Sequence, residues 1–288
     1  MSNSYHLAVL LGMFLLFSSA DAAEKIVPDN KVVYKKIGQR TLKLHVFYPK
    51  GHKATDRRAA IVFFFGGGWV VGSPRQFYQQ ARRFSDLGLV AISAEYRVIE
   101  KHKTTPFECV KDGKSAVRWI REHAAELGID PQRIIAAGGS AGGHVAACTG
   151  VIRGQGEKGE DTQISDLPNA MILYNPVLDT TEKGYGLNMV GQARKTEISP
   201  CHHIRKGIPP TLIFHGTADT TVPFENAERF ATQMNSAGNT CVLMPFQGRQ
   251  HGFFNGSFFR PKNGDKDFKL IMEKSREFLI TLGFLKRG

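Results

Sequence analysis

The chain has 288 residues, of which 42% are hydrophobic and 22% charged, and its formal net charge is +12 at pH 7. These apolar residues suffice for a packed core and exclude a disordered chain. The basic residues are spread along the chain instead of forming one stripe, so the composition favours a solvated basic surface over nucleic-acid binding.

Residues 1–22 have the pattern of a signal peptide. An apolar core at 7–17 precedes small residues and the A-x-A cleavage pattern of residues 20–22. The apolar run is short for a bilayer and has no basic flank, which argues against a stable membrane anchor. We therefore expect export to the periplasm or the medium, with residues 23–288 forming a single catalytic domain.

The rest of the chain alternates between strand and helix patterns. Two alternating segments around Gly38 predict a hairpin. Continuous apolar runs then alternate with amphipathic segments, which predicts an α/β fold with a mostly parallel, doubly wound sheet and helices on both faces. We expect strands over 59–65, 89–96, 133–139, 170–178, 211–216 and 241–246, and helices over 73–88 (capped by Ser73), 108–128, from Ala141, 223–238 and 265–282.

Two stretches depart from this alternation. Residues 153–168 are charged and rich in glycine, and they enter a strand at its N-terminal end, away from the expected site. Residues 180–209 leave a strand at its C-terminal end, where open α/β sheets bind ligands. They mix Lys183, Arg194 and Lys195 with only scattered apolar residues. We expect this small insertion to shape the substrate site and not to form the apolar lid of a lipase.

The segment IIAAGGSAGGHVAA, residues 134–147, sets Ser140 among four glycines between a strand and a helix. In one interpretation, Ser140 only caps a helix that packs closely on the sheet. In the other, the segment is a nucleophile elbow, G-x-S-x-G, whose strained turn exposes the serine hydroxyl at the sheet edge. The second interpretation requires an acid and a histidine later in the chain.

Asp219 and His251 meet this requirement, because each follows a predicted strand and therefore lies at the same sheet edge as Ser140. A serine hydroxyl becomes a nucleophile when a base takes its proton and an acid holds that base in one tautomer. The order Ser, Asp, His is that of α/β-hydrolases. Asp179, also at a strand end, is the alternative acid.

The glycine run in FFFGGGW follows the strand over residues 59–65. Backbone N–H groups in such a turn can point toward the crevice and bind a developing oxyanion. By position we assign Gly67 and Gly68 as donors, together with the backbone N–H of Ala141.

The motifs FGGGW, AEYRV, GGSAGGH, HGTADTTVP and HGF stand in the order found in α/β-hydrolase esterases. The chain resembles the hormone-sensitive-lipase-like group, and with it the secreted bacterial acetylxylan and feruloyl esterases. Two residues depart from the family pattern: Phe65 replaces a histidine, and Glu95 replaces an aspartate. The first departure puts the anchoring of the glycine loop in question.

The other notable polar residues are expected to be structural. His144 and His215 are expected to pack or brace loops near the site, and Arg97 to tie a loop. The adjacent pair His202 and His203 lacks partners at ligand spacing, so we predict no metal site. The cysteines show no C-x-x-C pattern and are expected to be buried, with one disulfide left open: Cys109, Cys148, Cys201 and Cys241.

The resemblance implies a secreted serine carboxylesterase that needs no cofactor. Its expected substrate is an acylated polysaccharide or oligosaccharide from which it removes short acyl groups, above all acetyl. A feruloyl esterase or a general carboxylesterase or lipase is the alternative. Two less favoured alternatives are a prolyl-oligopeptidase-like peptidase, which usually carries a large extra domain, and a non-catalytic binding protein on the same fold.

Overall fold

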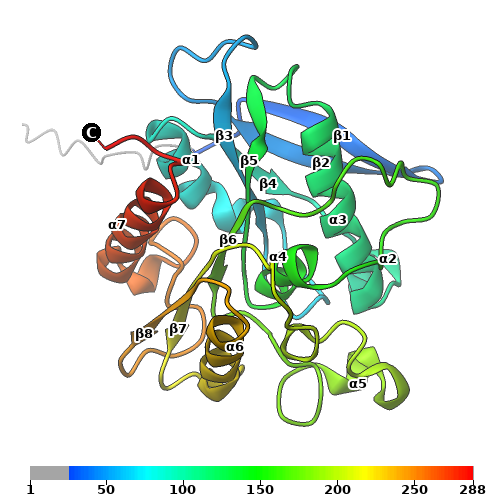
Figure 1. The fold of residues 1–288 in the computed structure, drawn as a ribbon. Coiled ribbons are helices and arrows are strands. Elements are labelled where there is room, and N and C mark those ends of the chain that lie inside the picture. Colours follow the sequence, from blue (N-terminus) through cyan, green and yellow to red (C-terminus); the bar gives the residue numbers. More distant parts are fainter. Residues whose placement is uncertain (1–25, 288) are drawn as a thin grey trace, which may run out of the picture.

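The computed structural model describes residues 26–287, so the predicted signal peptide at 1–22 lies outside the described residues. One eight-stranded sheet crosses the molecule in the order β1-β2-β4-β3-β5-β6-β7-β8 (Figure 1). The first two strands form the predicted hairpin; β2 is antiparallel to β4, and all later pairs are parallel. The strands are β1 (Asn30–Ile37), β2 (Arg40–Phe47), β3 (Arg58–Phe64), β4 (Val90–Ala94), β5 (Ile129–Gly139), β6 (Ala170–Tyr174), β7 (Thr211–Gly216) and β8 (Cys241–Phe246).

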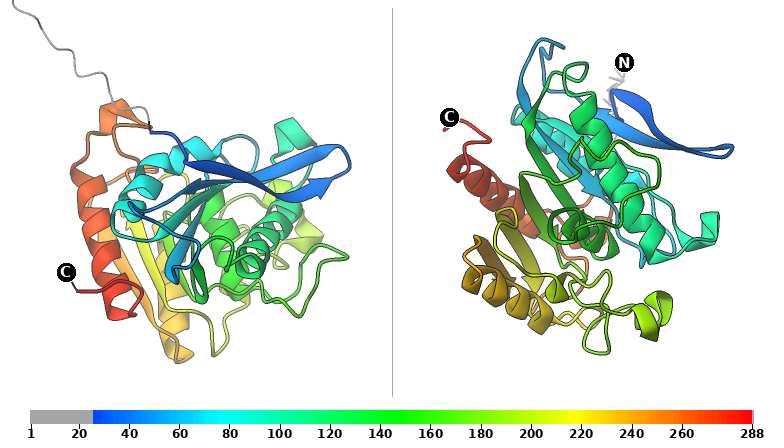
Figure 2. Two further views of the ribbon diagram at one scale, coloured as in Figure 1. Left: turned by 90° about the horizontal axis from the view of Figure 1, so that it is seen from above. Right: turned by 45° about the vertical axis from the view of Figure 1, so that its right-hand side comes forward.

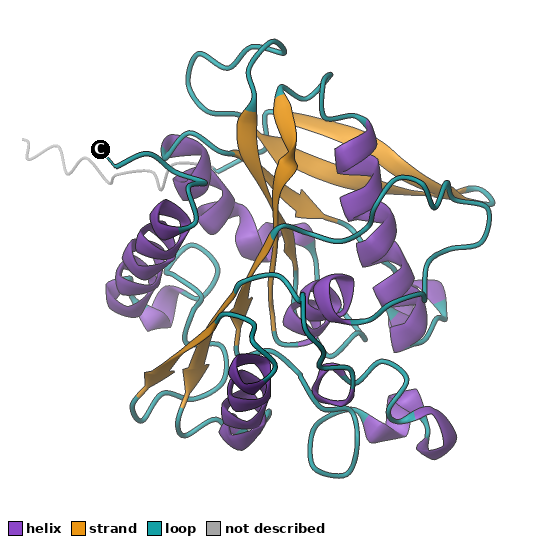
Figure 3. Cartoon of the chain, in the orientation of Figure 1, coloured by secondary structure: helices purple, strands orange, loops and turns teal. Residues whose placement is uncertain are grey.

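Helices cover both faces of the sheet, as the alternating pattern predicts (Figures 2 and 3). One face carries α1 (Tyr78–Asp86) and α7 (Lys266–Thr281), and the other carries α3 (Pro106–Glu122), α4 (Ala141–Val151) and α6 (Phe224–Ser236). The shorter helical turns are α2 (Ile99–His102), α5 (Leu187–Val190), η1 (Pro74–Phe77), η2 (Gln192–Arg194), η3 (Pro200–His202) and η4 (Pro261–Asn263). The predicted mostly parallel, doubly wound architecture is therefore confirmed.

The apolar runs form the centre of the sheet because helices exclude water from both of its faces. Every residue of β4, β6 and β7 is buried. Strand β8 has an equally apolar sequence but lies at the sheet edge, where Val242 is 42% exposed. Pro245 is tolerated in β8 because an edge strand leaves one side of its backbone unpaired.

Two helix boundaries differ from the prediction. The segment 73–88 begins with the 3-10 turn η1. Ser73 holds the predicted N-cap position before Pro74, but its side chain makes no capping hydrogen bond. The helix expected over 108–128 begins at Pro106, because Thr105 and Glu108 form a capping box, and it ends at Glu122. Turns then lead into β5.

A buried network of charges connects the hairpin, α3 and the segment 153–168. Asp112 is fully buried and accepts two hydrogen bonds from the Arg97 side chain, at 2.8 and 2.7 Å, and one from Lys35 Nζ at 2.7 Å. Glu157 pairs with the same two cations, each at 2.9 Å. Glu157 belongs to the segment 153–168, which was predicted to lie away from the site. This segment therefore supplies a carboxylate that pairs with the two cations. Arg97 ties a loop, as expected.

Asp112→Asn should reduce the free energy of unfolding by about 3–5 kcal/mol, because it leaves buried cations without their shared carboxylate. Urea denaturation would measure the change. Glu126→Gln is the matched control, since Glu126 is exposed on the turn after α3 and its loss should change stability by less than about 0.5 kcal/mol. A similarly small effect of Asp112→Asn would show that the network contributes little to stability.

Candidate active site

Ser140 lies at the turn between β5 and α4, with φ 57° and ψ −124°. A residue with a Cβ rarely adopts this conformation, and holding it there costs about 1–3 kcal/mol. The neighbouring glycines make the turn possible. A Cβ at Gly142 would lie 2.1 Å from the Phe64 carbonyl oxygen, and one at Gly138 would lie 2.3 Å from the Gly142 oxygen. The glycines are thus required by close backbone packing around the Ser140 turn, as in a nucleophile elbow.

The structure brings Ser140, His251 and Asp219 together. His251 Nε2 lies 2.9 Å from Ser140 Oγ, and His251 Nδ1 lies 2.7 Å from Asp219 Oδ2. The Asp219 carboxylate therefore holds His251 in the tautomer whose ring proton is on Nδ1. This tautomer leaves Nε2 free to accept the serine proton.

The environment of Asp219 keeps its carboxylate charged. Burial alone would raise the pKa of Asp219, but hydrogen bonds from His215, His251 and the Val222 N–H outweigh burial and hold the pKa well below its usual range. His215 is fully buried, and its Nε2 lies 3.3 Å from Asp219 Oδ2 and 3.1 Å from the Val222 carbonyl oxygen. His215 thus braces the acid loop, as the sequence suggested.

Asp179, the alternative acid, is engaged elsewhere. Its carboxylate accepts hydrogen bonds from Arg229 and from the Thr181 N–H, the latter at 2.7 Å. Within residues 26–287, no hydrogen bond joins Asp179 to His251. The structure therefore places Asp219, and not Asp179, in hydrogen-bond contact with His251.

The glycine loop supplies the expected N–H groups. Gly67 has φ +124°, and a Cβ there would lie 2.2 Å from the Val71 carbonyl oxygen, so only glycine fits this turn. No hydrogen bond within the described part of the chain uses the backbone N–H of Gly67, Gly68 or Ala141. These groups can therefore bind an oxyanion.

Other contacts replace the histidine that the family has at position 65. The Phe65 ring stacks on Tyr96 with centroids 4.1 Å apart, and the Tyr96 hydroxyl donates to the Phe65 carbonyl. Gln76 Oε1 accepts a hydrogen bond of 2.6 Å from the Gly66 N–H. The departure at Phe65 therefore leaves the loop anchored. Glu95 directly follows the interior strand β4, and its side chain accepts a hydrogen bond from the Lys43 N–H of β2.

A pocket of about 210 Å³ opens over Ser140. Sequence reasoning assigned no role to five of its polar residues: Gln76, Tyr185, Thr221, Asn255 and Arg260. Nothing in the pattern before Arg260 distinguishes it from other surface arginines. The pocket is lined by Gly66, Gly67, Gly68, Gln76, Ser140, Tyr185, Thr221, His251, Gly252, Phe254, Asn255 and Arg260.

Asn175 was also missed, although it directly follows β6. It is fully buried, and its side-chain oxygen accepts a hydrogen bond of 3.2 Å from the Gly252 N–H. Asn175 therefore helps to place the loop that carries His251. The available signal was the Asn-Pro pair inside the strand predicted over 170–178, because this pair is typical of a turn, and β6 ends before it at Tyr174.

The insertion at 180–209 borders the pocket through Tyr185, whose hydroxyl lies 2.9 Å from where a Cβ on Gly68 would stand. His144, on α4, connects the insertion to the elbow, because its Nε2 lies 2.6 Å from the Ile198 carbonyl oxygen. His202 and His203 contact Ser199 and Thr196, within the insertion. The insertion at 180–209 therefore lies beside the pocket, as expected.

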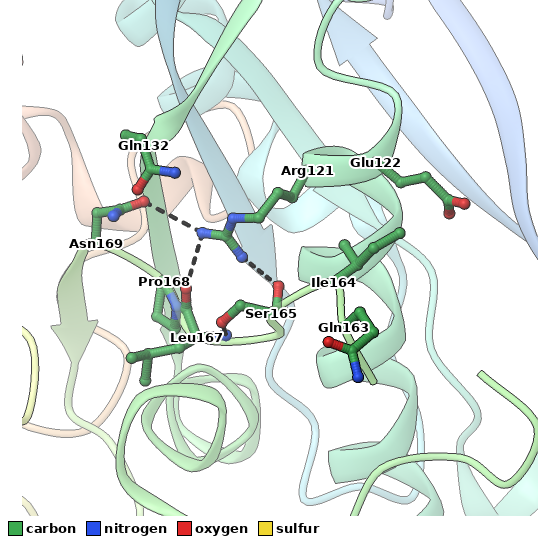
Figure 4. A pocket seen from close by; sticks show the side chains of 9 residues that line it. All are labelled: Arg121, Glu122, Gln132, Gln163, Ile164, Ser165, Leu167, Pro168 and Asn169. Atoms are coloured by element: carbon green, nitrogen blue, oxygen red, sulfur yellow. Dashed lines mark hydrogen bonds between the residues drawn. The ribbon is translucent and has the colours of Figure 1, made fainter. Parts of the chain in front are cut away.

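A second cavity, of about 590 Å³, lies at the opposite edge of the sheet (Figure 4). It includes Gln132 near the N-terminal end of β5, whereas Ser140 follows the C-terminal end of that strand. Arg121 at its centre donates to the carbonyl oxygens of Pro131, Ser165 and Leu167. Its guanidinium thus fastens the loop before β6 and is not free to bind a ligand.

Residues 26–287 contain no cluster of three or more His, Cys, Asp or Glu side chains that could hold a metal ion. The four cysteines are buried free thiols. No helix within that range is long and apolar enough to cross a membrane.

The model of the BD-FAE family matches residues 44–234, more than half of the chain. The chain belongs to the BD-FAE family. In its apo form, esterase 2 from Thermogutta terrifontis is 48% identical to this BD-FAE protein, with a TM-score of 0.86, and the match covers 92% of this chain and 98% of that chain. Together with the esterase neighbours and carboxylesterase relatives, the BD-FAE match confirms an α/β-hydrolase esterase of the hormone-sensitive-lipase type and the predicted class, a serine hydrolase acting on ester bonds.

Two curated relatives agree with this assignment. Carboxylesterase NlhH from Mycobacterium tuberculosis is 26% identical, and the match covers 88% of this chain and 90% of that protein. The "Probable isoprenylcysteine alpha-carbonyl methylesterase ICMEL1" of Arabidopsis thaliana is 27% identical over 73% of this chain. The BD-FAE protein spans only about half of that relative, 48% of its length.

The two candidate acids can be separated by mutation. Asp219→Asn should lower esterase kcat/KM about 10⁴-fold, because the amide no longer holds His251 in the required tautomer. Asp179→Asn is the matched control and should cost less than tenfold. Initial rates with p-nitrophenyl acetate would decide, and the reverse pattern would assign the acid role to Asp179.

His144 should make the stability of this BD-FAE protein depend on pH. Burial lowers the pKa of His144 from 6.5 to about 4, against the opposing effect of its hydrogen bond to Ile198. The folded state thus favours the neutral ring. The stabilisation is complete above pH 6.5 and is lost as the pH falls toward 4.

Between pH 7 and 4.5, wild type should therefore lose about 2–3 kcal/mol more stability than His144→Gln, whose amide can replace the Nε2–H donor. Urea unfolding at both pH values measures this difference, with His123→Gln as the control at a partly exposed site. Equal losses in wild type and His144→Gln would contradict the assignment.

Proposed function

We propose that this chain is an exported serine carboxylesterase that hydrolyses short-chain acyl esters, above all acetyl groups on polysaccharides. The observation that carries the proposal is the hydrogen-bonded series Ser140–His251–Asp219 at the base of a small pocket. An acyl-enzyme mechanism explains why these three side chains and the free N–H groups of the glycine loop stand together.

In the first half of the reaction, Ser140 Oγ attacks the ester carbonyl carbon while His251 Nε2 takes the hydroxyl proton. The carbonyl oxygen becomes an oxyanion and accepts hydrogen bonds from the N–H groups of Gly67, Gly68 and Ala141. His251 then returns the proton to the leaving alcohol as the carbon–oxygen bond breaks. Asp219 keeps the transiently charged imidazole in place.

In the second half, a water molecule gives its proton to His251 and attacks the acyl carbon of the acyl-serine. The Ser140 oxygen leaves and recovers the proton, and the carboxylic acid is released. Each step uses only the groups already in contact across the site, so the mechanism requires no additional reactant besides water.

The size of the pocket supports a short acyl group. Its volume of about 210 Å³ lies below the 300–1,000 Å³ typical of sites for drug-sized ligands. Solved structures of Thermogutta terrifontis esterase 2 include a propionate-bound and a butyrate-bound form, and another is phosphorylated by paraoxon. These forms support the same chemistry and acyl size in this chain.

The alcohol part of the substrate is inferred from the net positive charge of the protein and from its predicted export. An A-x-A pattern ends at residue 22, and the net charge of +12 suits acidic or acid-decorated polymers outside the cell. The insertion at 180–209 lacks the broad apolar face that a lipase lid needs to meet an oil surface. A feruloyl esterase remains the second candidate because of the family resemblance.

A chain-length series of p-nitrophenyl esters tests the proposal. We expect kcat/KM to be highest for acetate or propionate and to fall by octanoate, because a longer chain exceeds the pocket. Ser140→Ala should lower turnover on the best ester by on the order of 10⁶, if the three side chains act as a unit.

An optimum at octanoate or beyond would overturn the short-acyl assignment, and Ser140→Ala with more than a tenth of wild-type activity would overturn the nucleophile. Release of acetate and ferulate from native polysaccharides then separates the two carbohydrate candidates. Release of neither would contradict a polysaccharide substrate while leaving the esterase mechanism in place.

A further inference from the structure

Arg260 places a guanidinium at the rim of the active-site pocket. It comes from the segment between β8 and α7, and its side chain lies over Gly252, the residue after His251. A Cβ on Gly252 would stand 2.7 Å from Arg260 Nη1 and 2.9 Å from its Cζ. The absence of a side chain at position 252 thus leaves room for the guanidinium beside the general base.

Several hydrogen bonds hold the backbone around Arg260. Its N–H donates to the Gly256 carbonyl and its carbonyl accepts from the Asn263 N–H, both at 2.9 Å. Asp265 accepts from the N–H and the hydroxyl of Ser257, both at 2.8 Å. The arginine is therefore presented by a loop fixed on both sides.

The charge of Arg260 has no acidic partner within residues 26–287. The pocket lining contains no aspartate or glutamate, and no salt bridge of the described residues includes Arg260. By contrast, Arg249, at the start of the same connection, pairs with Asp267 at 2.7 Å. An exposed guanidinium with free donors suits a carboxylate, which it can bind through two parallel hydrogen bonds.

The position of Arg260 indicates which part of the substrate it meets. In the proposed mechanism, His251 donates its proton to the leaving alcohol, so the alcohol must lie on the His251 side of the scissile bond. Arg260 packs over the residue next to His251, whereas Gly67 and Gly68 face the carbonyl oxygen. The guanidinium is therefore adjacent to the alcohol part of the ester.

We propose that Arg260 binds a carboxylate on the alcohol part of the substrate, so that the enzyme prefers acyl esters of sugars that carry a uronic acid. This inference rests on the proposed esterase function and refines its substrate class. The net charge of +12 adds a long-range attraction for such polyanions, but Arg260 supplies the local recognition.

The test compares two monoacetylated sugars that differ in one group: an acetyl ester of methyl glucuronoside and the matching ester of methyl glucoside. Acetate release gives kcat/KM for each, and their ratio measures the preference for the carboxylate. We expect a ratio above one in wild type and a fall of about tenfold in Arg260→Gln, since a charged hydrogen bond at an exposed site is lost. Arg260→Lys should give an intermediate ratio, because it keeps the charge but not the planar pair of donors.

Lys262→Gln is the matched control, since it removes one positive charge from the same loop at an exposed residue that does not line the pocket. Its ratio should equal that of wild type. An unchanged ratio in Arg260→Gln, or equal falls in both variants, would overturn the inference. If wild type hydrolyses neither these sugars nor p-nitrophenyl acetate, the esterase function itself fails, which is a different result.

Discussion

The site depends on the close approach of the β5–α4 turn to the end of β3. The backbone at Gly138 and Gly142 packs so tightly on itself and on the Phe64 carbonyl that no side chain fits between them. This packing forces Ser140 into its left-handed conformation and pushes its hydroxyl out of the sheet. The same strands that bury the core thus supply the rigidity that keeps a strained residue in place.

Buried charge is stabilised in two different ways in this molecule. At Asp112, the carboxylate is neutralised by the Lys35 and Arg97 cations and connects the hairpin to α3. At Asp219, the partners are histidines and backbone N–H groups, so the carboxylate keeps its negative charge while its proton donor His251 remains free to change state. Only the second arrangement can orient a base that gains and loses a proton during a reaction.

The strands, the main helices and the positions of Ser140, Asp219 and His251 could be predicted because they follow from short-range patterns. Apolar runs locate the strands, and parallel strands bring their C-terminal ends to one edge. Ser73 holds its predicted N-cap position, but a 3-10 turn, not an α-helix, begins after it and its side chain makes no capping hydrogen bond. The structure distinguishes Asp179 from Asp219 by their side-chain partners. Arg229 pairs with Asp179, whereas His215 and His251 contact Asp219.

Arg260 shows why the substrate side of the site was harder to predict. The residue stands nine positions after His251 in an irregular segment, and its relation to the pocket depends on Gly252, Asn263 and Asp265 together. Tyr185 reaches the same pocket from the insertion, on the side of the glycine loop. Ser140, Asp219 and His251 thus follow strands that can be located from their apolar runs, whereas Arg260, which we propose contacts the alcohol, comes from a connection whose shape no local pattern specifies. Substrate preference can therefore diverge among relatives while the hydrolytic centre stays fixed.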